Sequence, residues 1–301
     1  MPSKSSNSST TSRAGWWGAG RSRTGGTGLL GTIAASAAVV VLTGLLAAPA
    51  GAAVSTSAAT PPTSLSTSPL AGPLPAAFPS PTGQVTVTGT ISVSGTLDGQ
   101  LRRYCCIGDG SQNESQNPMF NLASGATLQN VIIGAPAGDG VHCAGPCTLR
   151  NVWWEDVGED AATFRGTSAS NQYLVDGGGA RSASDKVFQH NGAGTLTIRN
   201  FEVTNFGKLY RSCGNCSTQF KRNVVITGVT ATTPGSVLAG INSNFGDTAR
   251  LSNITIVNDA SRKVVICQKF IGNNTGAEPP KNGVGPDTTN CFFTPSNITY
   301  R

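Results

Sequence analysis

Leu128-Gln129-Asn130-Val131 and Leu149-Arg150-Asn151-Val152 are two copies of one short pattern, and their Asn positions are 21 residues apart. In each copy an apolar residue is followed by a spacer, an Asn and a second apolar residue. Four later copies accept Asp, Asn or Gly at the third position, which gives the key positions 130, 151, 176, 200, 228 and 253. Their separations of 21, 25, 24, 28 and 25 residues are typical of stacked supersecondary units.

The repeated units have the composition of strands. Val, Ile, Thr and Phe recur in short runs that Gly, Asn and Asp interrupt, and no stretch of the repeat region has a helical period. Short coils of 21–28 residues therefore predict an all-β fold, a right-handed parallel β-helix that forms a single solenoid around a continuous core. The recurring Asn is expected at a tight turn, where it tolerates the left-handed conformation. An antiparallel sandwich is the alternative, but it rarely keeps so regular a spacing.

The flanks of the repeat region predict how the solenoid begins and ends. Residues 85–97 alternate polar and apolar side chains, which indicates an opening strand or a cap over the first coil. Residues 272–290 are rich in Gly, Pro and Asn and are expected to form a long surface loop. Residues 296–300 predict a last strand.

Residues 1–53 have the features of a signal peptide. Four basic residues and no acidic one precede a largely apolar run from Leu29 to Ala48, and Ala48-Pro49-Ala50 is a small-residue cleavage pattern. A retained membrane anchor is the alternative, because the run is close to spanning length. We expect a secreted, extracellular protein that has no membrane contact after processing.

Residues 54–82 form a Ser/Thr/Pro-rich linker without a charge up to about Pro81, and residues 83–301 form the folded domain. The whole chain has 21 Lys and Arg against 15 Asp and Glu, but without the four basic residues of the signal peptide its net charge falls from +6 to +2. This charge does not indicate a nucleic-acid-binding surface. The domain is expected to be a monomer.

All eight cysteines lie in the predicted domain, and an even number in an exported chain favours disulfides. Cys213-Gly214-Asn215-Cys216 would also suit a redox pair or half of a zinc site. Zinc needs a second pair of similar spacing, and Cys143 and Cys147 match that requirement poorly. The pairing of the cysteines cannot be read from the sequence.

Charged residues are only 12% of the chain, yet a spaced set of both signs lies between residues 139 and 211. Its members are Asp139, Glu159, Asp160, Asp185, Lys186, Lys208 and Arg211. Many of their separations, from 20 to 27 residues, are close to one coil, so the set can share one side of the solenoid. The carboxylates would suit a hard cation such as calcium, and the basic residues an anionic substrate. A solvated ladder of salt bridges is the alternative.

Several longer stretches resemble a known family. They are residues 126–134, Asp139-Gly140-Val141-His142, residues 147–164, residues 185–191 and residues 207–216. Together they are similar to the polysaccharide lyase family 3 pectate lyases, and the likeness runs from about Gly99 to Tyr300.

The resemblance implies a calcium-dependent enzyme that cleaves polygalacturonate (pectate) by β-elimination and releases unsaturated oligogalacturonides. It implies Ca²⁺ ligands among Asp139, Glu159 and Asp160, and a further acidic groove residue at Glu114. Catalytic or substrate-binding roles would fall to three basic residues, Lys186, Lys208 and Arg211. Asp185 would also bind substrate. A β-helical pectin hydrolase and a non-catalytic β-helix that binds acidic polysaccharide are the alternative functions.

Lys186 is the first choice for the catalytic base and Arg211 the second, with Lys208 as a clamp for a substrate carboxylate. A lysine loses its proton more readily than an arginine, and nearby positive charge would lower its pKa further. The two histidines, His142 and His190, are expected to have structural or supporting roles.

Overall fold

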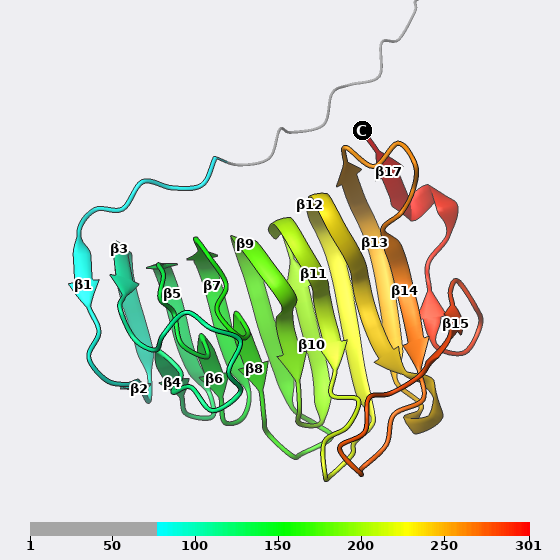
Figure 1. Cartoon of the computed structure of the whole chain (residues 1–301), viewed down its shortest axis with the longest axis horizontal. Coiled ribbons are helices and arrows are strands. Elements are labelled where there is room, and N and C mark those ends of the chain that lie inside the picture. Colours follow the sequence, from blue (N-terminus) through cyan, green and yellow to red (C-terminus); the bar gives the residue numbers. More distant parts are fainter. Residues whose placement is uncertain (1–76) are drawn as a thin grey trace, which may run out of the picture. The chain divides into compact units, whose positions relative to one another are not determined.

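The structure is a computed structural model that describes residues 77–301 (Figure 1). The predicted signal peptide and most of the predicted linker lie outside the described residues. Within residues 77–301, no helix is long and apolar enough to cross a membrane.

The described part consists of strands and two short 3₁₀ helices. The elements are β1 Gln84–Thr86, β2 Ile91–Val93, β3 Thr96–Cys105, β4 Phe120–Leu122, β5 Ala126–Ile133, β6 Val141–Cys143, β7 Cys147–Trp154, β8 Ala162–Phe164, β9 Gln172–His190, β10 Gly194–Arg199, β11 Glu202–Ser212, β12 Arg222–Asn242, η1 Ser243–Phe245, β13 Thr248–Val257, β14 Val265–Phe270, β15 Lys281–Val284, β16 Cys291–Phe292, η2 Pro295–Asn297 and β17 Ile298–Tyr300.

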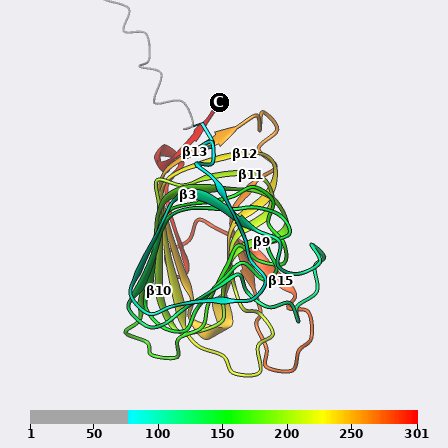
Figure 2. The same cartoon turned by 90° about the vertical axis from the view of Figure 1, so that its left-hand side faces the viewer.

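Successive coils pair in parallel, as a β-helix requires. β5 pairs with β7, β7 with β9, and β9 with both β10 and β11. Among the described strands only β15 runs antiparallel to its neighbour, β14. Figure 2 shows the coils stacked one behind another around an enclosed interior. The predicted parallel β-helix is therefore confirmed.

The interior is filled by side chains that repeat once per coil. One such row joins residues in parallel register and consists of Leu128, Leu149, Val175, Ile198, Ile226 and Leu251. Each of these side chains is almost completely buried. Burying a side chain of this size contributes about 1.5–3 kcal/mol, so the row stabilises the interfaces between the coils that it joins.

A second row forms the corner between two faces of the solenoid. Asn130, Asn151, Asn200 and Asn253 all have positive φ angles, between 51° and 54°. Asn151 Nδ2 donates to Asn130 Oδ1 at 2.9 Å, so neighbouring coils are also joined by side chains. The left-handed turn predicted for the recurring Asn is confirmed in these four coils.

The repeat was predicted wrongly in one coil. Gly177, and not Asp176, has the positive φ there, and Val175 takes the core position expected for Leu174. The strand register agrees with this assignment: Arg150 lies opposite Asp176, so the next residues, Asn151 and Gly177, occupy the same turn position. Glycine adopts the left-handed conformation without a steric cost, so it occupies the turn. Asp176 accepts a hydrogen bond from Asn200 Nδ2 at 3.2 Å beside that turn.

The two ends of the solenoid differ in how well they were predicted. β1, β2 and the start of β3 form the expected opening, and β17 is the expected last strand. The loop expected at residues 272–290 contains β15, which pairs with the edge of β14. Val284 of β15 pairs with Gln268, and Lys281 pairs with Phe270, a pairing that a Gly- and Pro-rich sequence does not reveal.

All eight cysteines form disulfides, as expected from an even number. The pairs are Cys105–Cys106, Cys143–Cys147, Cys213–Cys216 and Cys267–Cys291. The Cys213–Cys216 bond removes the thiolates that a zinc site would need.

Candidate active site

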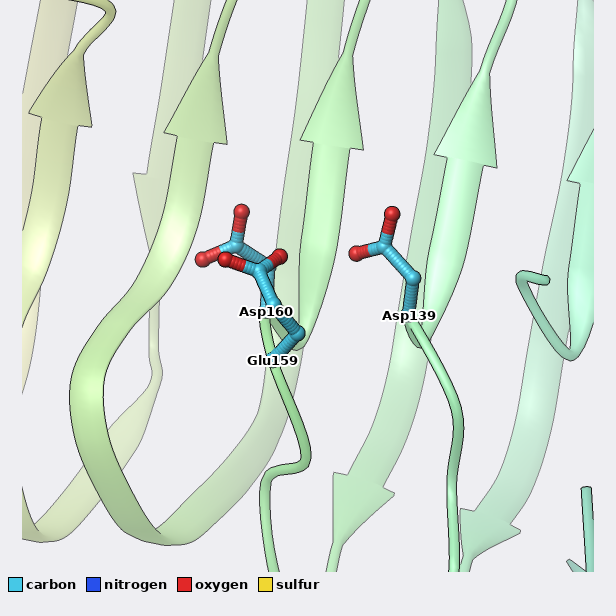
Figure 3. A group of neighbouring side chains, drawn as sticks. All are labelled: Asp139, Glu159 and Asp160. Carbon is cyan, nitrogen blue, oxygen red and sulfur yellow. The ribbon is translucent and has the colours of Figure 1, made fainter. Parts of the chain in front are cut away.

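Three carboxylates meet where two neighbouring coils turn into one face of the solenoid (Figure 3). Asp139 precedes β6, and Glu159 and Asp160 precede β8. These two strands are paired, with Val141 opposite Ala162. Side-chain oxygens of the three acids all lie within 4.8 Å of one another. The one-coil spacing seen in the sequence therefore brings these three predicted metal ligands together.

Gly140 allows this close approach. A Cβ atom at this position would collide with the carbonyl oxygens of Asp160 and Ala161 in the next coil. Its φ of 49° also lies in the region that favours glycine. Both features bring the backbone at Asp139 against the backbone at Asp160.

The acidic cluster, defined as Asp139, Glu159 and Asp160, is buried, with relative exposures of 8%, 4% and 3%. Burial raises the pKa of Glu159, and it raises the pKa of Asp160 well above its ordinary value. Among the described residues, Oδ1 of Asp139 and Oδ1 of Asp160 accept no hydrogen bond. Buried carboxylates without enough partners favour a bound cation. Three hard oxygen donors with free lone pairs fit calcium.

Lys186 lies directly on the acidic cluster. Its Nζ atom is 3.2 Å from Glu159 Oε1, 3.6 Å from Asp160 Oδ1 and 2.8 Å from Asp185 Oδ2. Burial alone would lower the pKa of Lys186. The charges of Asp160 and Glu159 and the hydrogen bond to Asp185 outweigh that effect and raise it. In this arrangement Lys186 holds its proton firmly.

Lys208 stands one coil further along, directly opposite Lys186 in the pairing of β9 and β11. Its Nζ atom donates to Asp185 Oδ1 at 2.5 Å. The Asp185 carboxylate therefore bridges the two lysines, and the hydrogen bonds from both lower its pKa although burial acts in the opposite direction. Because the side chain of Lys208 is 28% exposed, its ammonium group can reach a ligand.

Arg211 has surroundings unlike those of Lys186. Its Nη1 atom donates to Ser212 O at 2.7 Å and to Asn242 Oδ1 at 2.9 Å, and its guanidinium lies 3.9 Å above the ring of Phe270. No carboxylate of the described residues forms an ion pair with it. Burial lowers the pKa of Arg211 to about 10, against the opposing charges of Glu278 and Asp247.

A groove connects these groups. A cavity of about 620 Å³ contains the acidic cluster and Glu114, and an adjoining cavity of about 200 Å³ contains Lys186, Lys208 and Arg211. Glu114 and Gln189 line both. Loss of solvation and the charge of Glu159 raise the pKa of Glu114. Every predicted site residue lines one or both of these cavities.

The sequence did not reveal the residues that hold Arg211. Asn242 and Phe270 end β12 and β14, one and two coils beyond it. Neither belongs to a motif, and only counting the register outward from Arg211 could have found them. His190, by contrast, lies in the core as expected, with Nδ1 3.0 Å from Tyr210 Oη.

A β-helix with buried carboxylates beside lysines and an arginine in a polar groove is suited to an acidic polysaccharide. The chain belongs to the pectate lyase family, whose model matches residues 75–276. It is a lyase that acts on pectate.

Named relatives agree with this membership. Probable pectate lyase E of Neosartorya fischeri is 50% identical over 195 residues, which cover 63% of this chain and 74% of the relative. Pectate lyase E of Emericella nidulans is 47% identical over 197 residues, which cover 64% and 74%.

Solved structures give the same result. The catalytic domain of pectate lyase PelI from Erwinia chrysanthemi superposes with a TM-score of 0.63 at 33% identity, covering 72% of this chain and all of that domain. PelI in complex with tetragalacturonic acid gives a TM-score of 0.63 at 35% identity, covering 72% of this chain and 70% of PelI.

Proposed function

We propose that this enzyme is a secreted, calcium-dependent pectate lyase that cleaves polygalacturonate by β-elimination into unsaturated oligogalacturonides. The observation that carries the proposal is the buried acidic cluster, whose groove continues past two lysines and an arginine. Asp139, Glu159 and Asp160 would hold the calcium ion. A bound calcium ion would supply electrostatic stabilisation for negative charge on a substrate carboxylate.

β-Elimination breaks the C5–H and C4–O bonds of a galacturonate unit and forms a C4–C5 double bond, and the leaving oxygen gains a proton. Of the two candidate bases, we assign the removal of the C5 proton to Arg211. It is held rigidly, it is free of a carboxylate ion pair among the described residues, and its pKa of about 10 allows a neutral fraction in alkaline solution. Lys186 remains the alternative base.

The other basic residues stabilise charge in this proposal. Lys208 is partly exposed at the groove and would bind a substrate carboxylate. Lys186 keeps positive charge beside the acids, and Asp185 fixes both ammonium groups. Glu114 lies where the two cavities meet and would contact substrate hydroxyl groups. The positive charges of Lys186 and Lys208 would stabilise the negative charge that develops at the substrate carboxylate in the transition state.

The assay for this function follows ultraviolet absorbance of unsaturated uronates on polygalacturonate. The absorbance should increase when calcium is present. The increase should stop when a chelator is added and resume with excess calcium. Magnesium serves as the control ion. New reducing ends without absorbance would indicate a hydrolase instead. Full activity in chelator would exclude the calcium requirement.

Secretion is part of the proposal and has its own test. The full chain should appear outside the producing cells with an N-terminus near residues 50–54, because the small-residue pattern there suits cleavage. N-terminal sequencing of the exported protein measures this. A cell-bound protein that begins at residue 1 would contradict it and favour the retained anchor.

A further inference from the structure

A chain of three side chains leads from the groove wall to the acidic cluster. His142, in β6, lies with Nε2 2.6 Å from Asp139 Oδ2. Arg165, which follows β8, lies with Nη1 2.9 Å from the other ring nitrogen of His142, Nδ1. The side chains of His142 and Asp139 are each 11% exposed, whereas Arg165 is an exposed residue of the groove wall.

These contacts determine where the proton of the imidazole lies. An arginine guanidinium only donates hydrogen bonds, so Nδ1 of His142 must accept. The contact with Arg165 therefore assigns the acceptor role to Nδ1, and the N–H group at Nε2 donates to Asp139 Oδ2.

The hydrogen bond divides the two oxygens of Asp139 between two tasks. Oδ2 accepts from His142, while Oδ1 is buried and accepts no hydrogen bond from the described residues. Oxygen atoms of Asp139, Glu159 and Asp160 converge within 4.8 Å (Figure 3). A carboxylate fixed through one oxygen keeps the other available for a cation, with little rotational freedom to lose on binding.

We propose that His142 is a positioning residue that fixes the Asp139 carboxylate for a divalent cation, and that Arg165 sets its tautomer. The inference rests on the calcium site of the proposed function and extends it to two residues outside the acidic cluster. Neither residue touches the reacting atoms in this role. His142 acts through Asp139, and Arg165 acts through His142.

The test measures calcium binding directly, by calorimetry on the purified enzyme without substrate. His142→Leu removes both contacts and should weaken calcium binding about 10- to 100-fold. His142→Gln is the conservative rescue, because its amide can donate to Asp139 and accept from Arg165. It should recover most of the affinity. Arg165→Met, which keeps the length but not the donors, should weaken binding less than His142→Leu.

Asn121→Leu is the matched control. Asn121 lies directly opposite His142 in the pairing of β4 and β6, yet it has no hydrogen bond to the acids. This variant should bind calcium as the wild type does. Circular dichroism verifies the fold of each variant, and the Arg165→Met and His142→Gln results decide the question if His142→Leu does not fold.

Kinetics separate positioning from a direct catalytic role. With saturating calcium, His142→Leu should recover a kcat close to that of the wild type. A folded His142→Leu that binds calcium normally would overturn the inference, and so would a low kcat that calcium does not restore. If the wild type itself binds no calcium, the calcium site of the proposed function is overturned, and this inference with it.

Discussion

At the scale of single residues, the two candidate bases differ in their neighbours. Lys186 has three carboxylates within 4 Å, which stabilise its charged form. Arg211 has two neutral oxygen acceptors and an aromatic ring. Burial without a carboxylate partner lowers the pKa of a cation, and burial with several partners does not. These contacts favour Arg211 over the first choice made from the sequence.

The pH dependence of kcat should therefore follow Arg211. With a pKa of about 10, the neutral form is roughly 1% of the total at pH 8 and grows tenfold with each pH unit. We expect kcat to rise up to about pH 10 in the wild type and in Lys186→Ala. Arg211→Ala should lose about 10²- to 10⁴-fold in kcat and the pH-dependent rise.

Steady-state kinetics between pH 7 and 11 measure this, with Lys186→Arg and Arg211→Lys as charge-preserving controls. A rise that persists in Arg211→Ala but disappears in Lys186→Ala would assign the base to Lys186.

The acidic cluster makes a separate prediction. Asp139→Ala, Glu159→Ala and Asp160→Ala should each raise the calcium concentration for half-maximal activity by at least about tenfold, because each removes a charged ligand. Asp156→Ala, an exposed acid close to Glu159 in the sequence, is the control and should leave it unchanged. Unaltered calcium dependence in all three variants would mean that the ion binds elsewhere.

At the scale of elements, the turns between strands depend on residues that tolerate a left-handed backbone. Asn151 combines a φ of 52° with two side-chain hydrogen bonds. Its Nδ2 atom donates to Asn130 at 2.9 Å, and its Oδ1 atom accepts from Trp153 Nε1 at 2.6 Å. One residue thus fixes a turn and links two coils.

Asn151→Ala should lower the free energy of unfolding by about 2–3 kcal/mol. The left-handed conformation costs a residue with a Cβ atom about 1–2 kcal/mol; Asn offsets part of this through local hydrogen bonds of its side chain and Ala does not, and the two lost hydrogen bonds add to the difference. Asn151→Gly keeps the conformation and should cost less. Urea unfolding measures both, and the exposed Arg150→Ala is the control. Equal losses in the Ala and Gly variants would show that the turn conformation is not the cause.

At the scale of the described molecule, residues just before the predicted domain boundary at 83 contact the solenoid. The ring of Phe78 lies 5.1 Å from the ring of Trp153. The guanidinium of Arg181 lies 4.2 Å from the centre of the Phe78 ring. Thr82 adds a hydrogen bond from its backbone N–H to Leu101 O at 3.0 Å. None of these residues lines the groove.

A chain that begins at Ala77 and one that begins at Gly83 should therefore differ in stability but not in kcat. Loss of the Phe78 contacts should lower the free energy of unfolding by about 1–2 kcal/mol, because aromatic pairs add about 0.5–1.5 kcal/mol beyond the contribution of their buried area. Thermal unfolding and the absorbance assay compare the two chains. A lower kcat in the shorter, folded chain would mean that residues 77–82 support the groove.

The sequence by itself determined the β-helix, and it predicted a set of charged residues that the structure brings to one groove. Apolar residues and turn formers that recur every 21–28 residues can be buried only by stacking coils, so a sequence pattern suffices. The pattern missed Gly177 because Asp176 and Gly177 are both turn formers, and only the backbone conformation distinguishes them. It also missed β15, whose pairing depends on a strand edge and not on its own composition.

Only the tertiary structure decided how the charged residues face one another. One-coil spacing placed Lys208 and Arg211 equally well beside Lys186, but an irregularity after Phe206 sets the register. Lys208 therefore lies opposite Lys186, and Arg211 lies opposite Gln189. The pKa of each cation depends on these neighbours, because charge interactions fall with distance and burial removes the screening by water. Coil length predicts which residues share a face, whereas bulges and loops decide which of them touch.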